Sequence, residues 1–516
     1  MLILFFKSTL FAQTNLDNKR DYEWLFGYRY SDINYNLIDF NEKPSKIGQI
    51  IAPQVKSPNE LNAQISDKKG KLLLYTYGCD IRDSKHNIVQ GGDSIGYGNY
   101  WDLFCAKNSG STLIQGAIIL PNPMNDNKYH IFQTYVSDEY KSHATKLLMH
   151  EVDMSLNSGK GKVIVKNKVF YNKIVNYSKM TACRHANGKD WWLVIPERTD
   201  EGLNSPYYLS FLYTGDSIYA PIRHNPGNFL VNNIKWEADM VAFSPDGTKY
   251  ARTRSKENRL YLYDFDRSTG LLSKMRTTEI KSNNTYGSGV AFSPDSKLLY
   301  ISSDSVMYQI NTEVKDLEDG VQLIGTYDKY VVNGFFPTSF MYSMLAPDCK
   351  IYVATGGTTE FIHVVNYPNR KGLACGLEQR ALKMPTKIAG NLPNYPHYRL
   401  GKLGEAFSPC DSTINPYIKG DFTSMENVVE QPITVAVYPN PAQQDLNVDL
   451  FGFVRQYNSG HFDLYNLQGQ LVQSYPLLPE HDEYRLDISK FNNGIYIWQL
   501  VLDSKVRKSG KVVKME

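Results

Sequence analysis

The sequence lacks an excess of charge of either sign. Its 516 residues include 56 Lys and Arg against 53 Asp and Glu, which gives a formal net charge of +3 at pH 7. A protein that binds a polyanion usually presents a strongly basic surface, which attracts the phosphates and raises their local concentration. The balance of charge therefore argues against a nucleic-acid partner.

Long apolar runs are missing as well. No segment approaches the ~20 apolar residues that a membrane-spanning helix needs, so the sequence predicts no transmembrane segment. The first residues, MLILFFKSTLFA, are apolar and end in a small residue. They predict a secretory signal peptide over residues 1–12, cleaved after Ala12. The alternative is that these residues form a buried first strand.

Cysteines are few and are not spaced like metal ligands. None of the six stands in a CxxC pair, and no histidines cluster with them, so we expect no zinc or other metal site and no cofactor. An even number of cysteines can pair in an oxidising compartment. Proximity along the chain favours the disulfides Cys79–Cys105 and Cys375–Cys410. The other two cysteines, Cys183 and Cys349, are expected to be small buried residues.

A helical hydrophobic period is absent from the first 400 residues, and a β-type repeat is present instead. Tyrosine is abundant (37 residues), which is typical of half-buried strand surfaces. Six blocks combine a polar turn, usually a lysine, and a run of strand formers, at intervals of 48 to 62 residues. The blocks read SDKKGKLLLYT (66), MNDNKYHIFQT (124), HANGKDWWLVI (185), SPDGTKYART (244), SPDSKLLYIS (293) and APDCKIYVAT (346).

The spacing of the blocks suits four short strands and their turns. Pro, Asp and Gly in SPDG each favour a tight reversal of the chain, so each block predicts a hairpin. We therefore predict an all-β chain with a β-propeller over residues 20–412. Seven blades are favoured, with six or eight as alternatives, and residues 23–30 and 394–401 would together form the seventh blade.

The repeats and the segment CRHANGKDWW resemble those of secreted WD-like propeller proteins of the Bacteroidota. The motifs that carry the resemblance are AFSPDGTKYA (242–251) and AFSPDSKLLYIS (291–302). The resemblance implies an architecture and a destination but supplies no reaction.

Strand signals resume near the end of the chain, after a polar stretch over residues 413–431 that predicts a linker. Short alternating strands over residues 432–516 predict a small immunoglobulin-like β-sandwich. This stretch resembles the type A C-terminal sorting domain of the type IX secretion system. The residues that match its motifs are Tyr438, Pro439, Asn440, Pro441, Gly469, Gly494 and Tyr496.

The resemblance of the tail implies a route of export. The protein would cross the inner membrane by its signal peptide, pass through the periplasm, and cross the outer membrane by the type IX machinery. The sorting domain would then be removed, and the remainder would be released or attached to surface lipopolysaccharide. The protein would thus be secreted or held on the outer cell surface.

Two short motifs carry residue types that suit catalysis. Gly-Asp-Ser occurs in GGDSIGYG (91–98) and in TGDSIYA (214–220), which is similar to the nucleophile block of some lipases and esterases. No parallel sheet is predicted around it, and the tripeptide also suits a turn. The second motif, HATKLLMHEVD (143–153), brings His150 and Glu151 together without the HExxH spacing of a metalloprotease.

The segment TACRHANGKDWWLVIPER (181–198) predicts a ligand site at the mouth of the propeller channel. Adjacent tryptophans cannot both face one side of a regular strand, so one of the pair would face the solvent or the channel. Arg and Trp are preferred anchors for such contacts. The alternative is that both tryptophans pack between blades. The candidate ligand-binding residues are Arg184, His185, Trp191, Trp192, Glu378 and Arg380.

Three functions are consistent with the sequence. We rank first a binding module for protein or glycan, because no catalytic set is recognisable. The second is a secreted hydrolase or lyase acting on polysaccharide or peptide, in which Arg184, His185 and Glu378 would carry the chemistry. The third is a structural protein of the cell surface or matrix.

Overall fold

The computed structural model describes residues 19–28, 34–52, 59–107, 109–137, 143–199, 201, 203–227, 238–282, 287–388, 390, 392–405, 407–411, 414, 434–451, 459–478, 483–502 and 505–515. The chain divides into two compact units, Met1–Asp421 and Phe422–Glu516. The predicted signal peptide, residues 1–12, lies outside the described residues, and so does the predicted linker, residues 413–431, apart from Ile414.

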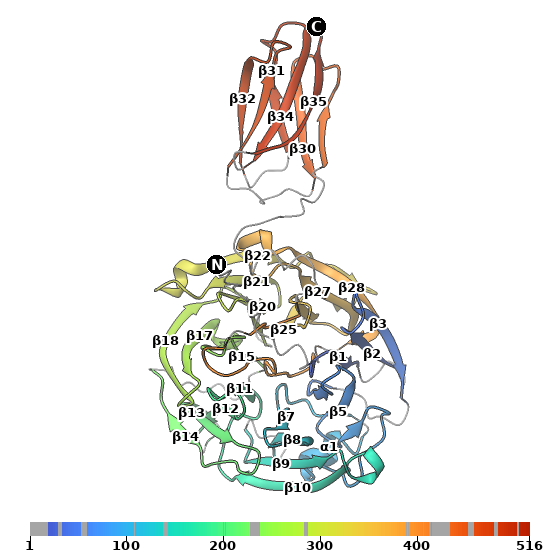
Figure 1. Ribbon diagram of the computed structural model, residues 1–516, viewed down its shortest axis with the longest axis vertical. Coiled ribbons are helices and arrows are strands. Elements are labelled where there is room, and N and C mark those ends of the chain that lie inside the picture. Colours follow the sequence, from blue (N-terminus) through green and yellow to red (C-terminus); the bar gives the residue numbers. More distant parts are fainter. Residues whose placement is uncertain are drawn as a thin grey trace, which may run out of the picture. The chain divides into compact units, whose positions relative to one another are not determined.

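The first unit is a ring of small antiparallel sheets (Figure 1). Among the described residues, seven sheets have three or four strands each, and one further pair of strands forms a hairpin. Each sheet is made of strands that are consecutive in the chain, with the first strand near the middle of the ring and the last on the outside. The chain is all-β, and the first unit has a propeller-like arrangement.

Two of the seven described sheets have three strands, and the others have four. The three-stranded sheets are β1 (Glu23–Phe26), β2 (Asn34–Asp39) and β3 (Lys46–Ile51), and β4 (Ala63–Ser66), β5 (Leu72–Thr76) and β6 (Arg82–Asp83). The four-stranded sheets are β7 (Ala117–Asn122), β8 (Asn125–Tyr135), β9 (Lys146–Asp153) and β10 (Lys162–Tyr171); β11 (Thr181–Arg184), β12 (Trp191–Arg198), β13 (Asn204–Tyr213) and β14 (Ile222–His224); β15 (Val241–Phe243), β16 (Lys249–Arg254), β17 (Arg259–Asp266) and β18 (Leu271–Glu279); β19 (Gly289–Phe292), β20 (Leu298–Ser303), β21 (Val306–Asn311) and β22 (Val321–Thr326); and β25 (Phe340–Leu345), β26 (Ile351–Thr355), β27 (Thr359–Val365) and β28 (Leu377–Ile388). The hairpin is β23 (Val331–Val332) and β24 (Phe336–Pro337).

Helical structure in the first unit is limited to short pieces. The described elements are α1 (Asn99–Phe104) and the 3₁₀ turns η1 (Asn157–Gly159), η2 (Ser255–Glu257), η3 (Leu317–Gly320) and η4 (Gly372–Cys375). No described helix has the length and apolarity to cross a membrane.

The six repeat blocks form the turns between the first and second strands of six of the sheets. In the β15–β16 turn, the Ser244 hydroxyl donates to Asp246 and accepts the N–H of Lys249 at 2.9 Å. The β19–β20 turn repeats this geometry, with Ser293 donating to Asp295. The serine and aspartate of the block therefore satisfy the turn's own polar groups, which explains why this chemistry recurs.

The prediction that residues 23–30 and 394–401 share one sheet is wrong. Residues 23–26 form β1, which pairs with β2, and β2 pairs with β3, while residues 394–401 contain no strand. The ring instead closes by packing of the first sheet against the last. The side chain of Asn36 on β2 exchanges two hydrogen bonds with the main chain of Thr386 on β28, at 2.9 and 3.1 Å.

The second unit consists of two antiparallel sheets that share one core. One contains β29 (Thr434–Tyr438), β30 (Asp445–Phe451) and β33 (Glu483–Asp487), and the other β32 (Leu471–Leu477), β31 (Gly460–Tyr465), β34 (Gly494–Leu502) and β35 (Lys505–Lys514). Leu446 and Leu486 of the first sheet are buried together with Phe462 and Leu500 of the second. Alternating apolar residues on each strand thus build a two-layer unit with its own core.

One of the two predicted disulfides is present and the other is wrong. Cys79 is bonded to Cys105, but Cys410 is bonded to Cys349, and Cys375 is buried with a free thiol. The second disulfide was predicted from proximity along the chain, but the cysteines that pair are 61 residues apart. Residues 409–411 return to the β25–β26 turn, where the N–H of Asp411 donates to the carbonyl of Pro347 at 2.7 Å. Of the two cysteines expected to be unpaired, Cys183 is free and buried, but the expectation for Cys349 is wrong because it is bonded to Cys410.

We expect Cys410→Ser to lower the free energy of unfolding of the first unit by about 2–4 kcal/mol, because the bridge constrains a long loop of the unfolded chain. Cys375→Ser is the matched control for connectivity. Peptide mapping without reduction should give one peptide pair joining Cys349 to Cys410 in both the parent and the control. A pair joining Cys375 to Cys410 would contradict the assignment.

Candidate functional site

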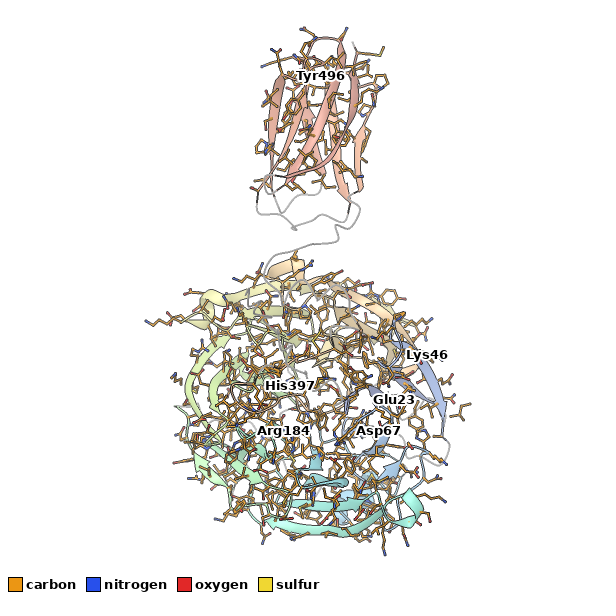
Figure 2. All side chains as sticks on the ribbon, in the orientation of Figure 1. Glu23, Lys46, Asp67, Arg184, His397 and Tyr496 are labelled. Atoms are coloured by element: carbon orange, nitrogen blue, oxygen red, sulfur yellow. A yellow bond between two sulfur atoms is a disulfide. The ribbon has the colours of Figure 1, made fainter. Side chains whose placement is uncertain are left out.

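The middle of the ring is occupied by residues 394–401, which we call the central segment. Figure 2 places His397 near the middle of the ring. The Asn394 amide donates to the carbonyls of Ala117 on β7 and Met180 beside β11, at 2.9 and 3.1 Å. The hydroxyl of Tyr398 donates to the carbonyl of Ile119 on β7 at 2.7 Å. The segment therefore satisfies carbonyls of several inner strands at once.

Further bonds attach the central segment to β1 and to Asp21, which precedes it. The hydroxyl of Tyr395 donates to the carbonyl of Glu23 on β1 at 3.0 Å. The Arg399 guanidinium pairs with the Asp21 carboxylate at 2.5 and 3.0 Å, and both side chains are almost fully buried. A buried ion pair that loses one partner leaves an uncompensated charge, so this pair fixes the end of the segment strongly.

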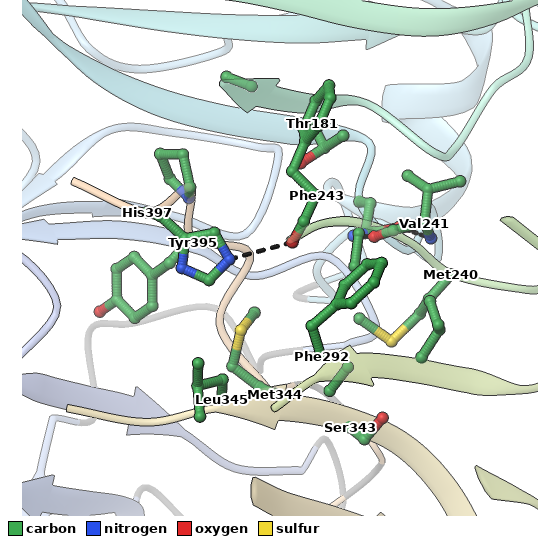
Figure 3. A pocket seen from close by; sticks show the side chains of 16 residues that line it. Thr181, Met240, Val241, Phe243, Phe292, Ser343, Met344, Leu345, Tyr395 and His397 are labelled. Atoms are coloured by element: carbon green, nitrogen blue, oxygen red, sulfur yellow. Dashed lines mark hydrogen bonds between the residues drawn. The ribbon is translucent and has the colours of Figure 1, made fainter. Parts of the chain in front are cut away.

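A small cavity remains beside the central segment (Figure 3). It is lined mainly by apolar side chains of β11, β15, β19 and β25, together with residues 395–397 of the segment. His397 lies at its edge, and its Nε2 donates to the carbonyl of Phe243 at 3.1 Å. The cavity volume is about 30 Å³. That is room for a water molecule or two and far less than the ~300 Å³ that small-molecule sites start from.

Arg184 and Trp191 form one buried unit against the central segment. The guanidinium carbon of Arg184 lies 3.7 Å from the centroid of the Trp191 ring, and its nitrogens donate to the carbonyls of Lys189 and Tyr398. Burial, with Arg20 nearby, lowers the pKa of Arg184. Trp191 is fully buried and packs edge-on against Tyr398 at 5.9 Å. This pair holds the ring and the segment together.

Both tryptophans are buried, so neither faces the solvent as predicted, and Trp191 instead faces the central segment that fills the middle of the ring. Trp192 lies on the opposite face of β12 among Tyr250 and Tyr263, and its indole N–H donates to the carbonyl of Arg267 at 2.8 Å. The two faces of β12 are covered by different neighbours, so adjacent residues are both internal. His185 caps the following turn, where its Nδ1 accepts the N–H of Asn187 at 3.0 Å.

Glu378 and Arg380 lie on β28, the outermost strand of another sheet, and are not brought together with Arg184 and His185. Glu378 is exposed. Arg380 forms a bidentate pair with Asp328 at 2.5 and 2.9 Å. The backbone N–H of Arg380 donates to Nδ1 of His363 at 3.0 Å. Burial lowers the pKa of His363 to about 4, so its imidazole is a neutral acceptor. Arg380 therefore helps to hold the outer edge of this sheet in place through Asp328 and His363.

A larger pocket lies in the outer part of the ring, between the β7–β10 sheet and the β11–β14 sheet. Its volume is about 300 Å³, which reaches the size of ligand sites. We call it the rim pocket. Its polar lining residues are His130 on β8, Glu151 on β9, Lys168 on β10, Tyr213 on β13, and Asp216 and Ser217 in the β13–β14 turn.

Three side chains of the rim pocket are linked in a row. The Tyr213 hydroxyl lies 2.5 Å from Nδ1 of His130, and Nε2 of His130 lies 3.6 Å from Glu151. Burial lowers the pKa of His130 and raises that of Tyr213, so at neutral pH the imidazole is neutral and the phenol is protonated. The phenol then donates to Nδ1, and the Nε2–H points toward the carboxylate. Glu151 also accepts from Lys128 at 2.8 Å.

Two signals in the sequence bear on this pocket, and neither identifies it. Gly215, Asp216 and Ser217 are the second Gly-Asp-Ser motif, and Glu151 belongs to the motif that includes His150. Each reads as an isolated motif, because nothing in the sequence shows that the two segments meet across neighbouring sheets. Among the described residues, no group of three or more His, Cys, Asp or Glu could hold a metal ion.

In the second unit, the residues of the YPNP motif are attached to the last strand. The Asn440 side chain donates to the carbonyl of Lys511 and accepts the N–H of Val513, both at 3.0 Å. Ala442 then pairs with the same strand, its N–H donating to Val513 at 2.8 Å. Gly469 sits in the β31–β32 turn with a φ of +77°, a conformation that favours glycine. Tyr496 donates to the carbonyl of Asn492 at 2.9 Å.

Residues 436–515 match the secretion system C-terminal sorting domain. The match runs from within β29 to the end of β35 and includes every residue of the predicted sorting motif. This tail indicates handling by the type IX secretion machinery, and therefore export to the cell surface or the medium.

The first unit is similar to solved structures of other propeller-like proteins. One is described as a candidate 6-phosphogluconolactonase from Bacteroides uniformis, at 13% identity and a TM-score of 0.42, covering 71% of this chain and 98% of that chain. The Dos1 propeller matches at 11% identity and a TM-score of 0.37, covering 65% of this chain and 74% of that chain. The periplasmic gluconolactonase PpgL of Pseudomonas aeruginosa matches at 10% identity and a TM-score of 0.31, covering 72% of this chain and 97% of that chain. No curated protein matches the chain.

Scores of this size carry no argument about activity. The propeller-like arrangement of the first unit rests on its own strand order and on the ring of sheets in Figure 1.

We expect Asn394→Leu to lower the free energy of unfolding of the first unit by about 3 kcal/mol, because buried carbonyls lose their donors. Lys402→Ala, at an exposed position just beyond the segment, should change it by less than about 0.5 kcal/mol. Urea unfolding followed by tryptophan fluorescence measures both, since Trp191 packs against Tyr398. Equal stabilities for the two variants would show that the segment does not hold the ring.

Proposed function

We propose that the protein is a binding module for protein or glycan, delivered to the cell surface or the medium by the type IX system. The observation that carries the binding role is the filled middle of the ring: the central segment leaves a cavity of about 30 Å³, too small for a substrate. Of the residues predicted to carry chemistry at the channel mouth, Arg184 and His185 are engaged in packing and turn bonds, and Glu378 lies on the outer strand of another sheet. An open pocket with polar lining residues lies elsewhere, on the outer part of the ring.

The finer architecture is part of the proposal. Seven sheets of consecutive strands favour seven blades, with the first sheet, β1–β3, as a complete blade of its own. The two-layer tail would be immunoglobulin-like. The similarity of the tail to type IX sorting domains supports an origin in the Bacteroidota, export by a signal peptide over residues 1–12, and release or attachment to lipopolysaccharide after the tail is removed.

A second candidate function is a secreted hydrolase. It is favoured by the row of Tyr213, His130 and Glu151, which places a neutral imidazole between a hydroxyl and a carboxylate. Such a row can transfer a proton in general acid–base catalysis. It differs from the arrangement expected from the sequence, which used Arg184, His185 and Glu378.

Deletion of residues 432–516 should leave the first unit folded but retained in the periplasm of a bacterium with a type IX system. The two units have separate hydrophobic cores, so loss of the tail removes no core residue of the first. Cell fractionation and protease accessibility measure the location. Full-length protein with Leu467→Ser, at an exposed tail position, is the control and should be delivered normally. Surface delivery of the deleted protein would contradict the sorting role.

Binding and hydrolysis are separated by one comparison on the purified full-length protein. Arrays of glycans and peptides should give saturable binding without product, because the rim pocket is open at the surface and the cavity beside the central segment is too small for a substrate. Product formed over many turnovers per protein molecule, and lost in His130→Gln, would instead establish the hydrolase. Absence of both binding and turnover would favour the structural surface protein.

A further inference from the structure

We infer that the rim pocket is a site for a neutral oligosaccharide, recognised by Glu151, Lys168, Asp216 and Ser217. The pocket is built from two sheets that are neighbours in the ring, with strands β8, β9 and β10 on one side and β13 with its following turn on the other. This inference rests on the proposed binding function and assigns its ligand class and its site.

The pocket offers hydrogen-bonding groups that the protein does not use itself. Within the described part of the chain, the side chains of Lys168, Asp216 and Ser217 make no hydrogen bond or ion pair, although all three line the pocket. Glu151 accepts one bond from Lys128, and a carboxylate can accept several. The pocket therefore presents an ammonium donor, two carboxylate acceptors and a hydroxyl toward a single space.

The charges around the pocket cancel. Glu151 and Asp216 are opposed by Lys128 and Lys168, and burial lowers the pKa of His130, so this ring adds no charge at neutral pH. An anionic or cationic ligand would gain little in such a balanced field. A neutral ligand with many hydroxyl groups can use the donors and the acceptors at once.

Apolar side chains supply the remaining wall of the pocket. Phe170, Met149 and Ile218 line it beside the ring of Tyr213. Phe170 is held edge-on against Phe132 and Phe211, at centroid distances of 5.7 and 5.4 Å. A sugar ring has C–H groups on its faces and hydroxyls around its edge. It therefore matches a pocket that combines a fixed aromatic wall with convergent polar groups.

The turn that carries Asp216 and Ser217 is held in place before any ligand binds. The side chain of Asn122, the last residue of β7, donates to the carbonyl of Gly215 at 3.1 Å. Gly215 has a φ of +96°, and a Cβ at this position would lie 2.6 Å from Asn122 Oδ1. Gly215 thus allows a tight turn between β13 and β14, and Asn122 of the neighbouring β7–β10 sheet holds that turn in place. Such preorganisation lowers the entropic cost of binding.

Isothermal titration calorimetry on the full-length protein, with maltohexaose, cellohexaose and xylohexaose as probes, tests the site. At least one probe should bind the parent protein. Lys168→Ala and Asp216→Asn should each weaken that binding about tenfold, because each removes a charged hydrogen-bond partner of the ligand. Both side chains are exposed, so the fold should be retained, which thermal unfolding verifies.

The chain provides matched controls for both variants. Lys166 lies on β10 two residues from Lys168 but contacts Asp93, and Asp93 belongs to the first Gly-Asp-Ser motif. Neither residue lines the rim pocket. Lys166→Ala and Asp93→Asn should therefore change the affinity by less than twofold.

The outcomes separate the site from the function. Binding of no probe, or equal losses in the pocket variants and the controls, would overturn the site. Binding of peptides alone on an array would overturn the site and leave the binding function standing. Hydrolysis of a bound probe would overturn the binding function. If Lys168→Ala and Asp216→Asn also weakened binding of that probe, the assignment of the site would be retained.

Discussion

The hydrogen bonds of the central segment are the constraint on which the first unit depends. Inner strands of a ring of sheets present carbonyls and N–H groups toward a narrow space where water is scarce, and a buried group without a partner is costly. Asn394, Tyr395, His397 and Tyr398 supply donors to carbonyls of four different sheets or the residues beside them. Arg399 then joins the segment to Asp21 near the start of the ring. The central segment thereby fixes the ring from inside, and no described sheet combines a strand from residues 23–26 with one from residues 394–401.

That constraint explains which parts of the fold the sequence could predict. A turn such as SPDG satisfies its own polar groups, so its sequence pattern is local and recurs in each sheet that uses it. The first sheet lacks the block, so the repeat does not predict it. Residues 394–401 have the tyrosines of a strand but bond to carbonyls far away in the sequence, and no local pattern distinguishes the two roles. Strand existence was therefore predictable, and the closure of the ring was not.

The prediction of a tryptophan exposed to a ligand at the channel mouth failed for a related physical reason. The prediction assumed that each strand has one buried face and one solvent-exposed face, with adjacent side chains on opposite faces. A strand inside a propeller-like ring is covered on both faces. Trp191 packs against the central segment and Trp192 against the next sheet. Cys410 likewise pairs with Cys349 because residues 409–411 are returned to the β25–β26 turn. Local spacing predicts neither, since both contacts depend on which sheets become neighbours.

A filled middle also determines where new function can arise. Asn394 in the central segment donates to carbonyls in or beside two neighbouring sheets, so a change there is costly whatever it adds. The β13–β14 turn differs from these positions, because Asp216 and Ser217 project from it while Gly215, Asn122 and the turn's own backbone bonds hold its shape. Substitutions in such a turn can alter the ligand while the ring remains unchanged. The separation of a rigid middle from adjustable outer turns therefore supports the rim pocket, rather than the middle of the ring, as the proposed ligand site.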